Sequence, residues 1–260
     1  MDSRTAASFL LLASRSVVKA TKPFILLMIS TERRWDALGL RPSAKRYLLL
    51  ALVLPATVIS AAYASLWISG LAPFRFVGGF SLLGRLGYEW TIGFALAFFG
   101  ALVEELVWRG FVVSWLVKRF DPVAVLWLTW VGWFSCRLPV VLLQEHPLSI
   151  VLQLAAVGTL LFALNIILTW LRLRSNSVWP CIVFHGANSF LILGIFDLLT
   201  DKTGPGSWLA GQSGVALAGA YLAIAIPFFW ALATSRVPSA PDREPGHTNP
   251  PSLSESRTNQ

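Results

Sequence analysis

Six apolar runs, each long enough to cross a lipid bilayer, constrain the fold of this chain more than any other feature. They cover about residues 47–70, 88–116, 121–143, 149–171, 177–200 and 208–233. A helix that crosses the hydrocarbon layer needs about 20 predominantly apolar residues. The runs are continuous rather than alternating, and strands of a membrane barrel are only about 10 residues long. The sequence therefore predicts an all-α polytopic membrane bundle of about six transmembrane helices.

The charged residues support a membrane location. They make up 13% of the chain, against about 25% in soluble domains. Lys and Arg are concentrated before the first run, in alternate connections and after the last run; the set is Arg4, Arg15, Lys19, Lys22, Arg33, Arg34, Arg41, Lys45, Arg46, Lys118, Arg119, Arg172, Arg174, Arg236, Arg243 and Arg257. Such a bias marks cytoplasmic segments. We therefore predict a multi-pass protein of the cell membrane with both termini in the cytoplasm, in contact with membrane lipid. The net charge of +8 does not indicate a nucleic-acid partner.

Two segments of different character flank the predicted bundle at residues 47–233. Residues 1–46 mix apolar runs with cations, so we expect one or two interfacial amphipathic helices in a cytoplasmic N-terminal segment. The alternatives are a signal peptide, or a first span shortened by a start codon assigned too far downstream. Residues 234–260 are polar and rich in Pro, Ser and Asn, and we expect a disordered cytoplasmic tail.

Ionisable residues inside the apolar runs are the candidate functional residues, because charge in the bilayer interior is costly. Glu104, Glu105 and Arg109 lie in the second run. Glu105 and Arg109 are four residues apart and can pair on one helix face. Glu104 lies about 100° around the helix and is then available as a general base. The alternative is a structural ion pair between helices, with Glu104 satisfied by a neighbour.

A second polar group lies in the fifth run, where Asn188 and Ser189 follow His185 by three and four residues. An imidazole and an amide side by side can donate hydrogen bonds to a developing oxyanion. The alternative is a core histidine that joins helices. Cys136 and Cys181 are predicted to be small buried residues. No cofactor is predicted, and three histidines in the whole chain support a divalent metal only poorly.

These motifs resemble the CAAX protease and bacteriocin-processing family, also called Abi proteins, which are intramembrane endopeptidases related to type II CAAX prenyl endopeptidases. The resemblance covers about residues 35–200, with a core at about 88–200. It is carried by Glu104-Glu105-x-x-Trp-Arg-Gly, by Trp-Pro-x-x-x-x-His185 and by Leu-Gly-Leu-Arg-Pro at residues 38–42. It implies a peptide or protein substrate, prenylated or not, and a water activated by Glu104. Glu105 and Arg109 would hold the site together, and His185 with Asn188 would stabilise the oxyanion.

The chain departs from the family pattern at two positions. The second family motif ends in a histidine that positions the water, and Arg137 occupies that place here. Arginine cannot act as a base, and it would neutralise Glu104 instead. Trp127, Trp130 and Trp133 share a helix face with Arg137, so we expect their rings to cover its guanidinium. The third motif places Asn four residues after His, where this chain has Ser189, with Asn188 as a substitute one position earlier.

Two functional hypotheses follow, with a third of a different class. The first is an intramembrane endopeptidase with Glu104 as base. The second is a catalytically impaired relative that binds or scaffolds other proteins, its cavity filled by a Glu104–Arg137 pair. The third is a small transporter, which the lack of an evident internal repeat disfavours.

Overall fold

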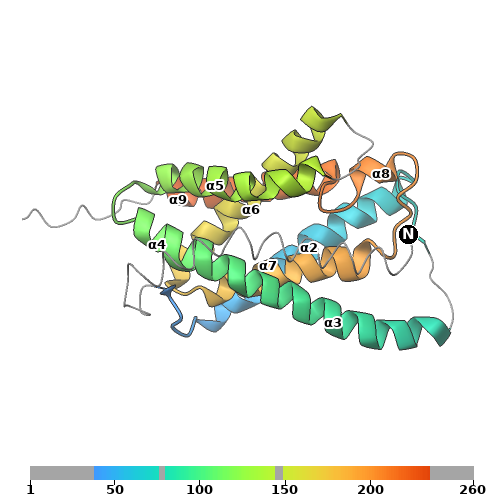
Figure 1. Cartoon of the computed structure of the whole chain (residues 1–260), viewed down its shortest axis with the longest axis horizontal. Coiled ribbons are helices and arrows are strands. Elements are labelled where there is room, and N and C mark those ends of the chain that lie inside the picture. Colours follow the sequence, from blue (N-terminus) through green and yellow to red (C-terminus); the bar gives the residue numbers. More distant parts are fainter. Residues whose placement is uncertain (1–37, 76–79, 144–148, 235–260) are drawn as a thin grey trace, which may run out of the picture.

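The computed structural model describes residues 38–75, 80–143 and 149–234, and these form a helical bundle (Figure 1). The main elements are α2 (Lys45–Ile68), α3 (Phe80–Glu105), α4 (Val113–Leu116), α5 (Pro122–Leu142), α6 (Ile150–Ser175), α7 (Trp179–Leu191), α8 (Gly206–Leu209) and α9 (Val215–Ala233), with π-helical turns η2 (Leu106–Val112) and η3 (Ile192–Phe196). Within the described ranges there is no strand, only an isolated β-bridge between Phe74 and Thr200. The predicted interfacial helices before residue 38 and the tail after residue 234 lie outside the described residues.

Six helices are long and apolar enough to cross a membrane, as the sequence predicts. They are Lys45–Ile68, Trp90–Leu116, Pro122–Leu142, Ile150–Ser175, Trp179–Phe196 and Val215–Ala233. The largest difference from prediction is at the last span, which begins seven residues later than the expected start at 208. The short helix α8 and a turn at Gly211, where φ is +95°, occupy that interval. Glycine permits this backbone conformation at little steric cost.

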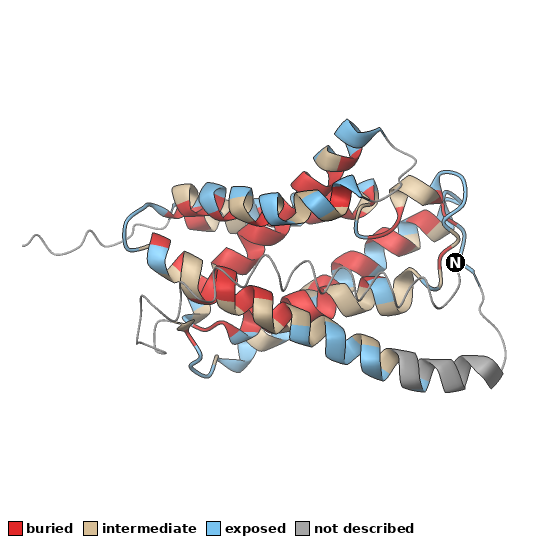
Figure 2. Ribbon diagram, in the orientation of Figure 1, coloured by how far each residue is buried: buried red, intermediate tan, exposed pale blue. Residues whose placement is uncertain are grey.

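Helices α6 and α7 form the centre of the bundle. In the apolar 18-residue stretch of α6, 61% of the residues are buried, the largest share among the six spans. Helix α6 packs mainly against α9 and α5, whereas α7 packs against α2 and α3. The buried residues are concentrated along these central helices in Figure 2. Because the remaining helices surround them, polar side chains on α6 and α7 are shielded from lipid.

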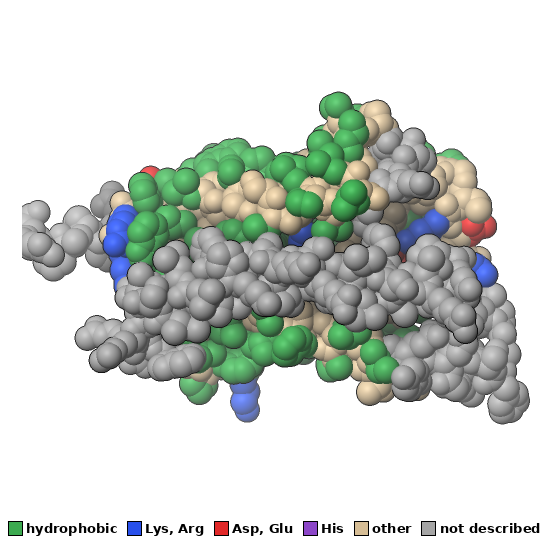
Figure 3. Space-filling view, in the orientation of Figure 1, with side chains coloured by type: hydrophobic (Ala, Val, Ile, Leu, Met, Phe, Trp, Pro, Cys, Tyr) green, Lys and Arg blue, Asp and Glu red, His purple; other side chains and the backbone are tan. Residues whose placement is uncertain are grey.

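The outer surface of the bundle is apolar, as expected for helices that face lipid tails. On the face drawn in Figure 3, hydrophobic side chains cover much of the described surface, and Lys and Arg form only small patches. Large exposed apolar side chains include Leu49, Phe99, Trp127, Val131 and Trp230. An exposed apolar surface of this extent would be unfavourable in water but is the normal exterior of a membrane protein.

Residues 38–42 form a short strap across the ends of α6 and α7. The carbonyl oxygens of Gly39 and Leu40 accept hydrogen bonds from Val178 N (2.8 Å) and Trp179 Nε1 (3.1 Å). Gly39 has φ +69°, and a Cβ at this position would lie 2.6 Å from the Arg172 guanidinium carbon. A larger residue would be strained at this φ and would also displace the Arg172 guanidinium. The strap fixes the beginning of α7, the helix that carries His185.

Candidate functional site

Glu104 and Glu105 lie where α3 changes into the π-helical turn η2. A π-turn widens the helix locally and is frequent at functional sites. The side chain of Glu104 is 8% exposed and that of Glu105 is fully buried. Each carboxylate therefore requires a cationic or hydrogen-bonding partner inside the bundle, and the two have different partners.

Glu105 is the centre of an ion-pair group that links three helices. Its Oε1 lies 3.1 Å from Arg109 NH1 and 2.8 Å from His185 Nδ1. Arg109 also donates to Asn165 Oδ1 on α6, at 3.1 Å. Arg109 and Asn165 are fully buried. The predicted contact between Glu105 and Arg109 is thus present, and His185 joins the same group.

Asn165 is a member of this group to which the sequence analysis gave no role. Its Nδ2 donates to the Leu126 carbonyl oxygen (2.9 Å), and its Oδ1 also accepts from Thr129 Oγ1 (3.1 Å). The amide is therefore oriented by α5 and presents its oxygen to Arg109. A polar asparagine within an apolar run was the only signal in the sequence, and it could not show which partner Asn165 contacts.

Glu104 is held by α5. Arg137 NH2 lies 2.7 Å from Oε1 and 2.9 Å from Oε2, and Trp133 Nε1 donates to Oε2 at 3.0 Å. The guanidinium of Arg137 covers one side of the carboxylate, and the Arg137 side chain is itself 28% exposed. Both carboxylate oxygens of Glu104 are therefore engaged by fixed donors.

Trp133 connects the two carboxylate groups. Its ring lies under the Arg109 guanidinium, with the guanidinium carbon 4.4 Å from the ring centroid, and it packs edge-on against His185 at 5.7 Å. The expectation that tryptophans cover Arg137 is wrong in this respect, because Trp133 covers Arg109. Trp127 is 49% exposed, and Trp130 donates to the Gly158 carbonyl oxygen. The position of Trp133 on the same helix face as Arg137 did not predict that Arg109, from the neighbouring helix, would contact the Trp133 ring.

Asn188 is buried and contacts α9. Its Oδ1 accepts a hydrogen bond of 2.6 Å from Tyr221, whose side chain is fully buried. This contact uses the amide oxygen and leaves the Nδ2 hydrogens of Asn188 as the donors available for a ligand. Ser189, the other candidate in this motif, is half-buried. The sequence analysis did not identify Tyr221, because nothing in the chain around it indicates a functional role.

Replacing Tyr221 by phenylalanine tests this contact. The change leaves the buried Asn188 oxygen without its donor, which costs about 1–3 kcal/mol, so the melting temperature of the purified protein should fall. Tyr221→Phe should also weaken any ligand that depends on the Asn188 amide. The control is Tyr47→Phe, which removes a half-buried hydroxyl at the bundle end. An unchanged melting temperature and unchanged ligand affinity for Tyr221→Phe would contradict the role given to this bond.

The two cysteines have different environments. Cys181 is fully buried and its thiol contacts the Leu168 carbonyl oxygen at 3.3 Å, in agreement with the prediction. Cys136 is exposed, which contradicts its predicted burial, because its side of α5 faces outward. Among the described residues, no group of three His, Cys, Asp or Glu side chains is placed to hold a metal ion.

The comparison with known families agrees with the motif analysis. The model of the family described as type II CAAX prenyl endopeptidase Rce1-like matches residues 85–191. No curated protein matches the chain. The matched segment runs from α3 to the end of α7 and contains both glutamates, Arg137, Asn165 and His185. Residues 85–191 of this chain are therefore similar to the type II CAAX prenyl endopeptidase Rce1-like family.

Proposed function

We propose that this protein binds a peptide or protein segment at the membrane, with or without a prenyl group, and does not hydrolyse it. The observation that carries this proposal is the contact between Glu104 and Arg137 at 2.7 and 2.9 Å. A general base must accept a proton from water. An arginine in contact with both carboxylate oxygens stabilises the ionised form, which makes Glu104 a weaker proton acceptor.

Arg137 cannot replace the missing base. Its guanidinium stays protonated and carries donors only, so it cannot take the proton from water or orient water as an acceptor. Trp133 is likewise a donor only, and it occupies Glu104 Oε2. The imidazole of His185 directs its Nδ1 to Glu105. The groups around Glu104 thus favour a stable ion pair over proton transfer.

Peptide binding is supported by hydrogen-bond donors of Asn188 and Arg137 that the contacts described above do not use. The Nδ2 donors of Asn188 are suited to a peptide carbonyl oxygen, since Tyr221 occupies the amide oxygen. Arg137 is partly exposed and carries further N–H donors. The matching family is described as a prenyl endopeptidase, and this supports a peptide, with or without a prenyl group, as the ligand class.

The proposal is tested with the full-length protein in liposomes and a fluorogenic, photo-crosslinkable peptide, prepared with and without a prenyl group. We expect crosslinking to the wild-type protein that unlabelled peptide competes away, and peptide turnover no higher than that of Glu104→Ala. Wild-type turnover that Glu104→Ala abolishes would overturn the loss of hydrolysis. The absence of specific crosslinking for both peptides would overturn the binding role.

An active endopeptidase is the second candidate. It is favoured by the contacts of His185 with Glu105 and of Glu105 with Arg109, the predicted scaffold, and by the donor amide of Asn188, which with His185 was predicted to stabilise the oxyanion. This candidate requires that Arg137 leaves Glu104 during turnover. The same liposome assay distinguishes the two candidates, because only the endopeptidase shows turnover dependent on Glu104.

A further inference from the structure

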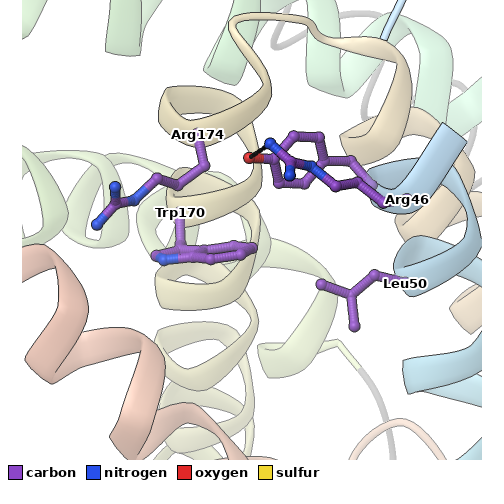
Figure 4. A pocket seen from close by; sticks show the side chains of 5 residues that line it. Arg46, Leu50, Trp170 and Arg174 are labelled. Atoms are coloured by element: carbon purple, nitrogen blue, oxygen red, sulfur yellow. Dashed lines mark hydrogen bonds between the residues drawn. The ribbon is translucent and has the colours of Figure 1, made fainter. Parts of the chain in front are cut away.

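An open pocket of about 450 Å³ lies between the beginning of α2 and the end of α6 (Figure 4). It is lined by Arg46, Tyr47, Leu50, Trp170 and Arg174. These residues are separate from the Glu104 and Glu105 groups. Arg46, Tyr47 and Leu50 precede the segment matched by the family model, whereas Trp170 and Arg174 lie within it. Because both helices cross the membrane and terminate here, the pocket lies at the boundary between the lipid tails and water.

Both helices contribute a charged residue and an apolar residue to the pocket in the same arrangement. Arg46 and Leu50 are four residues apart on α2, and Trp170 and Arg174 are four residues apart on α6. Each helix therefore presents an arginine near its end and an apolar side chain one turn deeper, about 5.4 Å further along the axis. Figure 4 shows Arg174 above Trp170 and Arg46 above Leu50, with the Arg174 guanidinium directed away from Arg46.

The rim carries two positive charges, and none of the five lining residues is acidic. Both arginines are exposed. Arg46 lies with its guanidinium carbon 4.9 Å from the Tyr47 ring centroid and donates to the Tyr47 hydroxyl at 3.3 Å. Tyr47 in turn packs edge-on against Trp170 at 6.1 Å. The aromatic pair thus restricts one arginine at the rim.

We propose that this pocket binds an anionic phospholipid. The phosphate lies between Arg46 and Arg174, and the first part of the acyl chains lies over Leu50 and Trp170. Guanidinium groups bind phosphate oxygens through charge-assisted hydrogen bonds, and basic pockets between transmembrane helices bind lipid headgroups. The apolar layer one turn below the charges matches a lipid rather than a free phosphate, which has no apolar part to bury.

Native mass spectrometry of the full-length protein in detergent tests the proposal, with phosphatidylglycerol and phosphatidylcholine as probes at equal concentration. We expect the wild-type protein to retain phosphatidylglycerol at least 10-fold better than phosphatidylcholine, as about 1.4 kcal/mol of selectivity would give. The variant Arg46→Gln/Arg174→Gln should lose this preference. Arg119→Gln is the matched control, because Arg119 is exposed at the end of α4, over the Trp115 ring and outside the pocket.

The proposal is wrong if the double variant retains phosphatidylglycerol like the wild-type protein, or if phosphatidylcholine binds equally well. It is also wrong if soluble glycerol phosphate displaces the lipid at equal concentration. The last outcome would indicate a site for free phosphate. If the double variant does not fold, the wild-type protein still provides a test, because its preference for phosphatidylglycerol should fall as salt rises. A preference independent of salt would contradict binding by the two exposed arginines.

Discussion

Arg137→His is expected to give the protein a peptide hydrolysis activity that depends on Glu104 and that the wild-type protein lacks. Arg137 and Trp133 are four residues apart on α5, and both reach Glu104. A histidine at position 137 would therefore face the same carboxylate, without the fixed positive charge that engages both oxygens. Positioned acid–base groups contribute about 10²–10⁴-fold to rates, so turnover should rise at least about 100-fold above the wild-type background.

Two matched variants separate the imidazole from the loss of charge. Arg137→Gln removes the charge but supplies no imidazole, and Arg137→His combined with Glu104→Gln removes the base. Both should remain at background in the liposome assay with the fluorogenic peptide. The explanation is wrong if Arg137→Gln is as active as Arg137→His, or if wild-type protein already cleaves the peptide at the rate of the histidine variant.

Arg109→Met is expected to be the most destabilising single change in the site. Arg109 is fully buried, contacts Glu105 and Asn165, and lies over the Trp133 ring. Removing one member of a buried ion pair leaves an uncompensated charge, which costs about 3–5 kcal/mol. Glu105 would retain His185 as a partner, so we expect a loss near the lower limit, about 3 kcal/mol, in the free energy of unfolding measured with SDS in mixed micelles.

A double-mutant cycle shows whether the loss arises from the unpaired carboxylate. Glu105→Gln combined with Arg109→Met removes both charges, and it should be more stable than Arg109→Met alone by at least about 1 kcal/mol. Lys118→Met is the control, because Lys118 is an exposed cation after α4. Equal stability of the single and double variants would show that lost packing of the Arg109 side chain, rather than the unpaired charge, causes the effect.

The spans and the main motif could be predicted from the sequence because both depend on local order along the chain. An apolar run of about 20 residues satisfies its own backbone hydrogen bonds as a helix in lipid, whatever surrounds it. The contact between Glu105 and Arg109 follows from a spacing of four residues on one helix. The strap at residues 38–42 was visible as a motif, although its position against Arg172 was not.

Contacts between distant positions depended on the packing of the helices. Asn165 reaches Arg109 across 56 positions, and Tyr221 reaches Asn188 across 33. Neither distance has a periodic signal in the sequence. The π-turn at Leu106–Val112 changes the direction of side chains after Glu105, and no residue type in the run indicates it. Trp133 shows the consequence, because its helix face was predicted correctly while its cationic partner was not.

The sequence by itself determined a six-span helical protein with ionisable residues in its apolar runs and an arginine where the family pattern has histidine. These features are local, since the cost of lipid exposure is set residue by residue along each run. Only the tertiary structure decided which charges meet: Arg109 and His185 with Glu105, and Arg137 with Glu104. Ion pairing depends on a few ångströms between atoms on different helices, and the packing of whole helices sets that distance.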